Sequence, residues 1–141
     1  MFSERDLSIE ADLRWLHQAR EWAARAAQDF GFEEDGCYQV KLAMSEAVAN
    51  AIQHGSRSKE DAVHISARER DGALVFEVRD TGSYVEPEAP PAEMAERGRG
   101  LALVGLVMDE VDLQPGEAGS LLRFAKRLEG IGGPRASSGA T

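Results

Sequence analysis

The chain is short of cysteine, of basic residues and of long apolar runs, and each shortage excludes a class of protein. Its single cysteine, Cys37, rules out an internal disulfide framework and a zinc site built from several cysteines. No stretch approaches the roughly 20 consecutive apolar residues of a membrane span. Residues 1–20 carry acidic side chains throughout and lack the apolar core of a secretory signal. We therefore expect a cytoplasmic protein without a membrane partner.

Acidic residues outnumber basic ones by 25 to 16, which gives a formal net charge of −9. Because nucleic acid is bound through basic faces, this balance disfavours nucleic acid as a direct partner. The 43% hydrophobic content is nevertheless that of a globular protein. A length of 141 residues suits one domain, which we expect at residues 1–129, followed by a flexible tail at 130–141 that is rich in glycine, serine and alanine.

The hydrophobic pattern predicts elements in the order β-α-α-β-β-loop-α-β-β. Apolar residues three or four apart indicate helices at 11–30 and 33–54, and an apolar run indicates a short helix at 100–108. Alternation indicates strands at 4–10, 63–68, 74–79, 110–113 and 120–128, with a hairpin turn at Asp71-Gly72 and a long loop at 81–97. This order predicts an α+β fold, a two-layer α/β sandwich with helices on one face of a mixed, mostly antiparallel sheet.

The second expected helix carries Glu46, Asn50 and His54, which are spaced by four residues and so share one stripe. Small alanines at positions 47, 49 and 51 would let a ligand approach this stripe. A carboxylate and a carboxamide one turn apart suit a hard cation, because the amide oxygen can ligate Mg²⁺ while the acid handles a proton. On spacing alone, a solvated helix face is an equal alternative, and His54 fits a helix cap as well as a pocket.

Two glycine-containing segments are the other candidates for a binding site. Arg79-Asp80-Thr81-Gly82 closes an alternating strand and can present a carboxylate to an exocyclic amine such as that of adenine, although a simple turn is the better explanation of this segment taken alone. Arg97-Gly98-Arg99-Gly100 precedes the expected helix at 100–108, where free backbone N–H groups and guanidinium groups favour a phosphate site over a flexible linker.

Together, Glu46-x-x-x-Asn50 on a helix, Asp80-x-Gly82 after a strand and Gly98-x-Gly100 before a helix resemble the N, G1 and G2 boxes of the GHKL ATPase superfamily. Within it, the segment from Ser45 to Gly55 and the run Met108-Asp109-Glu110-Val111 resemble the anti-sigma-factor serine kinases. The resemblance covers about residues 5–128. It implies the Bergerat fold of that superfamily, with ATP and Mg²⁺ as cofactors.

The resemblance also implies roles for individual residues. Glu46 matches the catalytic acid that orients or deprotonates the attacking hydroxyl, and Asn50 matches the ligand of Mg²⁺. Asp80 matches the acceptor of the adenine amino group. The other implied ATP-binding residues are His54, Gly82, Arg97, Gly98, Arg99, Gly100, Leu101 and Ser120, and Arg20 matches an arginine that contacts a partner. Tyr84 stands where a longer G1 box has a second glycine, which several kinases of this group also lack.

The implied activity is that of a Mg²⁺-ATP-dependent protein-serine kinase and anti-sigma factor. Its implied partners are a sigma factor, which it sequesters, and a STAS-type anti-anti-sigma protein, whose serine it phosphorylates; a homodimer is also implied. The alternative is a non-catalytic module that holds a nucleotide and switches a phosphatase or a signalling scaffold by contact. An intact carboxylate at Glu46 favours the enzyme.

Overall fold

The computed structural model describes residues 2–55, 61–80, 103–114 and 119–128. The elements in chain order are β1 (Arg5–Glu10), η1 (Leu13–Trp15), α1 (Leu16–Phe30), α2 (Glu34–Asn50), η2 (Ala51–Gly55), β2 (Ala62–Arg70), β3 (Ala73–Asp80), β4 (Glu110–Gln114) and β5 (Leu121–Arg127). Residues 103–107 form a further short helix. The expected tail at 130–141 and loop at 81–97 lie outside the described residues. None of the described helices is both long and apolar enough to cross a membrane.

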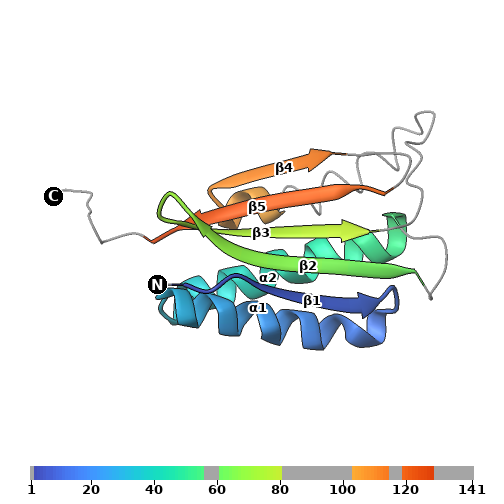
Figure 1. The fold of residues 1–141 in the computed structure, drawn as a ribbon, viewed down its shortest axis with the longest axis horizontal. Helices are drawn as coiled ribbons and strands as arrows, with labels where there is room; N and C mark the ends of the chain where they lie inside the picture. The colour runs from blue at the N-terminus through green and yellow to red at the C-terminus, as the bar shows by residue number, and fades with distance from the viewer. Residues whose placement is uncertain (1, 56–60, 81–102, 115–118, 129–141) are drawn as a thin grey trace, which may run out of the picture.

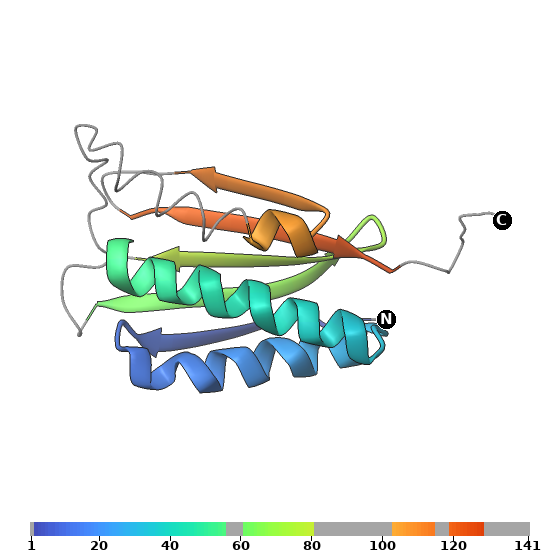
Figure 2. The same ribbon diagram turned by 180° about the vertical axis from the view of Figure 1, so that it is seen from behind.

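The strands form one sheet in the order β1-β2-β3-β5-β4, and the helices lie on one face of it (Figures 1 and 2). This arrangement confirms the predicted two-layer α+β fold, with β1 at an edge. Every pairing among the described strands is antiparallel, so this part of the sheet is antiparallel throughout rather than mixed. The reason lies in the connection between β1 and β2, because two helices that run in opposite directions return the chain antiparallel to β1.

The first helix begins differently from the prediction. Asp12 caps a 3₁₀ turn, η1, by accepting a hydrogen bond from the backbone N–H of Arg14 at 3.1 Å, and α1 follows from Leu16. It ends at Phe30, as predicted, and the following Gly31 has a φ of 123°, which suits glycine. The N–H of Phe32 then donates to the carbonyl of Ala27 at 3.0 Å, which completes a Schellman cap.

The second helix changes its winding at the residue predicted to bind Mg²⁺. The sequence predicts a regular helix to about His54, but α2 ends at Asn50 and residues 51–55 form a π-helical turn, η2. The N–H of Ala51, at the junction, approaches the carbonyls of both Ala47 and Val48, four and three residues earlier. Single π turns inside helices are often found at functional sites because they redirect side chains locally.

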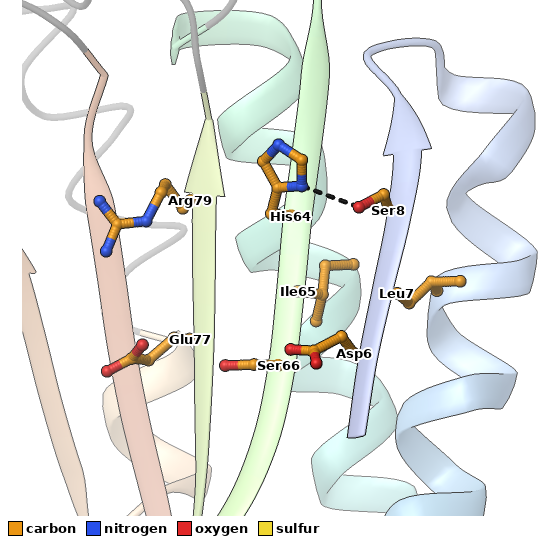
Figure 3. A pocket seen from close by; sticks show the side chains of 8 residues that line it. All are labelled: Asp6, Leu7, Ser8, His64, Ile65, Ser66, Glu77 and Arg79. Carbon is orange, nitrogen blue, oxygen red and sulfur yellow. Dashed lines mark hydrogen bonds between the residues drawn. The ribbon is translucent and has the colours of Figure 1, made fainter. Parts of the chain in front are cut away.

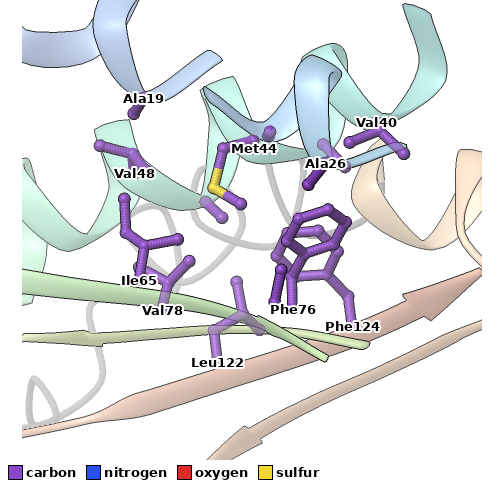
Figure 4. Packing of buried hydrophobic residues seen from close by; sticks show 14 of the residues in the cluster. Ala19, Ala26, Val40, Met44, Val48, Ile65, Phe76, Val78, Leu122 and Phe124 are labelled. Carbon is purple, nitrogen blue, oxygen red and sulfur yellow. The ribbon is translucent and has the colours of Figure 1, made fainter. Parts of the chain in front are cut away.

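The core lies between the helical layer and the inward side chains of the sheet (Figure 4). Alanines of α1 are fully buried, so small side chains bring this helix close to α2 and the sheet. The Phe76 and Phe124 rings stack from neighbouring strands with centroids 5.4 Å apart. The largest fully buried side chains are Phe76, Phe124, Met44, Ile65, Leu74, Val40, Val48, Val63 and Val104.

The hairpin between β2 and β3 fixes which residues face the core. Asp71 and Gly72 have φ values of 53° and 81°, the left-handed pair of a type I′ turn, as the sequence predicts. The resulting register places Val63 opposite Asp80. Because side chains alternate along a strand, Asp80 shares the core-facing side of β3 with Val78 and Phe76. The turn therefore determines the orientation of the predicted adenine-binding carboxylate.

Candidate functional site

Two predicted site residues meet where β3 ends and β5 begins. Asp80 is the last residue of β3, and Ser120 immediately precedes β5. The backbone N–H of Asp80 donates to the carbonyl of Ser120 at 3.1 Å, which continues the antiparallel ladder. The π turn η2 contacts β3 at the same end of the molecule (Figures 1 and 2). The end of α2 and the end of β3 therefore converge there.

Asp80 is a buried acid held by neutral donors. The residue is only 2% exposed, and it is the only charged residue that is buried among those the structure describes. The backbone N–H of Ser120 donates to Oδ1 at 3.2 Å, and the hydroxyl of Ser120 donates to Oδ2 at 2.5 Å. A carboxylate has about four acceptor positions, so both oxygens keep capacity for a further donor.

Burial sets the electrostatics of this carboxylate. Removal from water raises the pKa of Asp80 above the usual aspartate range, the hydrogen bonds from Ser120 oppose the rise, and the negative charge of Asp61 adds to it. Burial also strengthens any hydrogen bond that the carboxylate accepts. The site is therefore suited to accept an N–H donor from a ligand that excludes water.

Glu46 and Asn50 lie one turn apart on α2, as predicted, and both are partly exposed. Ala47 and Val48 between them point into the core, so the helix itself is fixed against the sheet. Because Asn50 is the last residue of α2, it lies next to the π turn that contacts β3. A carboxylate and a carboxamide oxygen in this position are the hard donors that a magnesium ion prefers.

The other predicted residues fall into two groups. His54 lies within η2 rather than within the regular helix α2 that carries Glu46 and Asn50. Arg20 is partly buried on α1, and its Nη2 lies 3.3 Å from Nδ1 of His17. The residues predicted to bind phosphate or to flank the adenine, Gly82, Arg97, Gly98, Arg99, Gly100 and Leu101, lie outside the described residues.

A separate hollow of about 340 Å³ lies on the outer face of the sheet, away from the helices (Figure 3). A hydrogen bond of 2.8 Å joins Ser8 Oγ to His64 Nδ1 across β1 and β2, and Arg79 follows in the same cross-strand row. Asp80, the next residue of β3, points to the opposite face. None of the predicted site residues lines this hollow, so it is distinct from the candidate site.

Sequence reasoning missed Lys126, which attaches the short helix to β5. Its Nζ donates to the carbonyl of Val107 at 3.1 Å. Lys126 follows Leu122 and Phe124 at alternate positions of β5, and both of those side chains are buried. A lysine at the next inward position of an apolar strand was the available signal, because a charged group there needs a specific partner.

Residues 9–126 match the model of the histidine kinase-like ATPase domain. The chain belongs to this family. Its membership confirms the resemblance to the GHKL superfamily that the three motifs indicated, and it agrees with the observed fold.

Individual proteins and solved structures are also similar to this chain. The chain is 26% identical over 137 residues to serine-protein kinase RsbW of Oceanobacillus iheyensis, covering 87% of this chain and 85% of that one. It superimposes with a TM-score of 0.70 and 19% identity on a structure of RsbU and RsbW domains from Mycobacterium tuberculosis, covering 89% of this chain and 32% of that chain. A histidine kinase domain from Erythrobacter litoralis gives a TM-score of 0.55 at 17% identity, with 82% of this chain and 71% of that one covered. At these identities the two structures show the fold alone.

Proposed function

We propose that the protein is a Mg²⁺-ATP-dependent protein-serine kinase that also acts as an anti-sigma factor. The observation that carries the proposal is the buried Asp80, held by Ser120, at the end of the molecule where α2 ends. Membership of the ATPase family and similarity to serine-protein kinases support it. In this proposal the substrate is a serine of a STAS-domain anti-anti-sigma protein, and the sequestered partner is a sigma factor.

Asp80 and Ser120 form the adenine end of the proposed site. The Asp80 carboxylate accepts a hydrogen bond from the adenine amino group, while Ser120 holds the carboxylate in a fixed orientation. The bond is made out of water, where a charge-assisted hydrogen bond is strong. Gly82, two residues beyond Asp80, leaves room for the ring.

Glu46 and Asn50 form the reacting end. Their oxygen donors, one turn apart on α2, fit a magnesium ion, which when bound neutralises negative charge on the phosphates. Asn50 holds the ion through its amide oxygen, and Glu46 accepts the proton of the incoming serine hydroxyl. The remaining residues proposed to contact the nucleotide are His54, Arg97, Gly98, Arg99, Gly100 and Leu101. Positioning and charge stabilisation are the main tasks in such a transfer.

In this proposal α1 contacts a partner protein, and two copies of the chain bind each other. Arg20 contacts a protein partner in this proposal, and its Nε is buried without a hydrogen-bond partner among the described residues. The active form is a homodimer, which light scattering of the purified protein would measure. Phosphorylation of the STAS protein adds negative charge, which a chain of net charge −9 repels, so the product is released.

The decisive experiment compares phosphate transfer by the wild type and by Glu46→Gln. STAS-domain proteins from the same organism are incubated with Mg²⁺-ATP, and serine phosphorylation is followed by mass spectrometry. We expect Glu46→Gln to bind ATP normally but to transfer phosphate about 100-fold more slowly or worse, because it lacks the proton acceptor. Glu69→Gln, an exposed glutamate on β2, is the matched control.

Each outcome decides between the alternatives. A wild type that binds ATP but phosphorylates none of these proteins would contradict the kinase and favour the non-catalytic regulatory module. Equal transfer by the wild type and Glu46→Gln would remove Glu46 from the mechanism. A parallel titration with and without Mg²⁺ tests Asn50, since we expect Asn50→Ala to abolish the effect of the metal on ATP affinity.

A further inference from the structure

The outer face of the sheet, which none of the described helices covers, has a basic centre (Figures 1 and 3). Because side chains alternate along a strand, the register of β2, β3 and β5 places five arginines and one acid on this face. The five arginines are Arg68, Arg70, Arg79, Arg123 and Arg127, and the acid is Glu77. We call these five arginines the basic strip. They give this face a surplus of positive charge on a chain whose formal net charge is −9.

Both edge strands are acidic on the same face. Their outward acids are all exposed, and they are Asp6 and Glu10 on β1 and Glu110 and Asp112 on β4. The positive charge is therefore confined to the three central strands. Neighbouring strands lie about 4.8 Å apart, so the basic strip is roughly 10 Å wide, which is close to the diameter of one α-helix.

Three arginines of the basic strip are already oriented by contacts within the sheet. Arg68 Nη2 and Arg123 Nε lie 3.3 Å and 2.9 Å from Glu77 Oε2. Arg127 Nη1 donates to the carbonyl of Asp71 at 2.8 Å. Each guanidinium group has five N–H donors, so most of its donors remain available for a ligand. A side chain that is oriented beforehand loses less entropy when it binds.

The strip also has an apolar floor. Ala73, Val75 and Ala125 are buried on the outer face, as a cluster separate from the main core. Arg68 lies opposite Val75 and Arg127 lies opposite Ala73 in the strand register, so the aliphatic parts of the arginines cover this floor. The charged ends are therefore the part of each side chain that faces outward.

Arg70 and Arg79 mark the two ends of the strip. Both are exposed, and neither makes a hydrogen bond or an ion pair with a residue that the structure describes. Arg79 lies opposite His64, six positions along β2 from Arg70, which corresponds to roughly 20 Å. The hollow of about 340 Å³ opens beside Arg79 (Figure 3). A ligand that reaches both arginines must be extended.

We propose that the basic strip docks an α-helix of a protein partner that carries a row of acidic side chains. The strip has the width of one helix, and its length matches about four helical turns. Guanidinium groups bind carboxylates through paired hydrogen bonds, which favours arginine over lysine on such a surface. The acidic edge strands then meet the polar or basic flanks of the same helix. This surface lies on the opposite face from the proposed ATP site, and the inference does not rest on the proposed function.

Two other occupants fit this face less well. Single-stranded nucleic acid is bound by stacking on aromatic side chains, and the described strands present none on the outer face. A duplex carries phosphates across a wider surface, which would extend over the acidic edge strands. A second copy of the chain packed centre to centre would bring two sets of arginines together, and like charges across an interface repel.

The test uses a designed helical peptide of about 20 residues, long enough to cover the strip, with glutamates three and four positions apart on one face. A peptide with glutamine in place of these glutamates is the control ligand. Binding to the full chain is measured by fluorescence anisotropy. We expect Arg70→Glu and Arg79→Glu each to weaken binding about fivefold, the order of one exposed ion pair. Arg25→Glu, an exposed arginine of α1 in the helical layer, makes the same charge change and should have no effect.

Mapping the bound peptide by nuclear magnetic resonance gives a second measurement. We expect the amides of Ser66 and Glu77, in the middle of the outer face, to shift on titration. The affinity should fall as salt is raised, because the contacts are between exposed charges. Circular dichroism checks that each variant is folded, and sedimentation of the wild type and Arg79→Glu compares their oligomeric states.

Each outcome decides the inference. Weaker binding by both Arg70→Glu and Arg79→Glu, with Arg25→Glu unchanged, supports it. A loss in Arg79→Glu alone would indicate a small anion site at the hollow and overturn it. No binding of the glutamate peptide, equal binding of the glutamine peptide or an equal loss in Arg25→Glu would also overturn it. So would tighter binding of an RNA oligonucleotide of equal charge, or a dimer that dissociates in Arg79→Glu.

Discussion

Strand β3 carries two acids on opposite faces, and they are held in opposite ways. Glu77 lies on the outer face, where its Oε2 is 2.9 Å from Arg123 Nε and 3.3 Å from Arg68 Nη2. Asp80 lies on the inner face, where among the described residues the donors to its side chain come from Ser120 alone. Glu77 keeps partial contact with solvent, whereas Asp80 is 2% exposed.

The difference agrees with a structural role for Glu77 and with the binding role proposed for Asp80. The charge of Glu77 is balanced by two arginines, and ion pairs at a partly exposed surface contribute modestly to stability. The charge of Asp80 is buried, its donors are neutral, and the negative charge of Asp61 acts on it, which together lower the stability of the folded state. Residues that lower the stability of a fold are often found at functional sites. For Asp80 we propose that this function is to bind a ligand.

The largest expected effect is on nucleotide affinity. Asp80→Asn removes the negative charge and replaces one acceptor oxygen with an NH₂ donor. We therefore expect the Kd for ATP to rise about 100-fold, the upper range for a charge-assisted hydrogen bond. Calorimetric titration measures it. Glu77→Gln is the matched control on the same strand, and a similar loss of affinity in that variant would show that the two faces do not differ in function.

The next effect concerns the residue that holds Asp80. Ser120→Ala removes the hydroxyl that donates to Oδ2 and leaves a buried carboxylate with one donor fewer. We expect the free energy of unfolding to fall by about 2 kcal/mol, because a charged acceptor loses its partner inside the protein. Urea denaturation measures the change. A Ser120→Ala protein as stable as the wild type would contradict the account of how Asp80 is held.

A smaller effect is expected on the outer face. Glu77→Gln weakens the contacts with Arg68 and Arg123, and we expect a loss of about 1 kcal/mol in the free energy of unfolding. ATP affinity should not change. Because the ion pairs are partly screened by water, the loss should shrink when the same denaturation is repeated at high salt. A loss independent of salt would point to packing instead.

The smallest effect is a dependence of stability on pH. Because burial raises the pKa of Asp80, its protonated form is the one that the folded state favours. The stability that this provides is complete below the aspartate pKa of the unfolded chain, about 3.9, and is lost as the pH rises through the raised value. Wild type should therefore lose stability relative to Asp80→Asn between pH 4 and pH 7. A constant difference over this range would contradict the assigned cause.

Local patterns in the sequence predicted the elements that depend on neighbouring residues. Three such features are set within a few positions of the chain: the spacing of Glu46 and Asn50, the turn at Asp71-Gly72 and the end of the first helix at Phe30. The π turn after Asn50 was not predictable, because the apolar pattern of residues 33–54 fits a regular helix through this segment equally well.

Contacts between residues far apart in the chain could not be predicted, because local sequence patterns carry no information about them. Ser120 and Asp80 are 40 residues apart, and their pairing follows from the register of β3 on β5. The sequence itself indicated Asp80 as a possible acceptor for an exocyclic amine, whereas Ser120 was assigned to the ATP site by resemblance alone. Neither residue had been expected to hold the other. Lys126 was missed because its partner, the carbonyl of Val107, belongs to the backbone and has no sequence pattern.

The most direct test of the central claim maps the response of backbone amides to Mg²⁺-ATP by nuclear magnetic resonance. If ATP binds on the inner side of the sheet at the end of α2, the amides of Asp80, Ser120 and the last turns of α2 shift on titration. Those of Ser8 and His64, on the outer face, should stay in place. Shifts confined to the outer face, or none at millimolar ATP, would contradict the account.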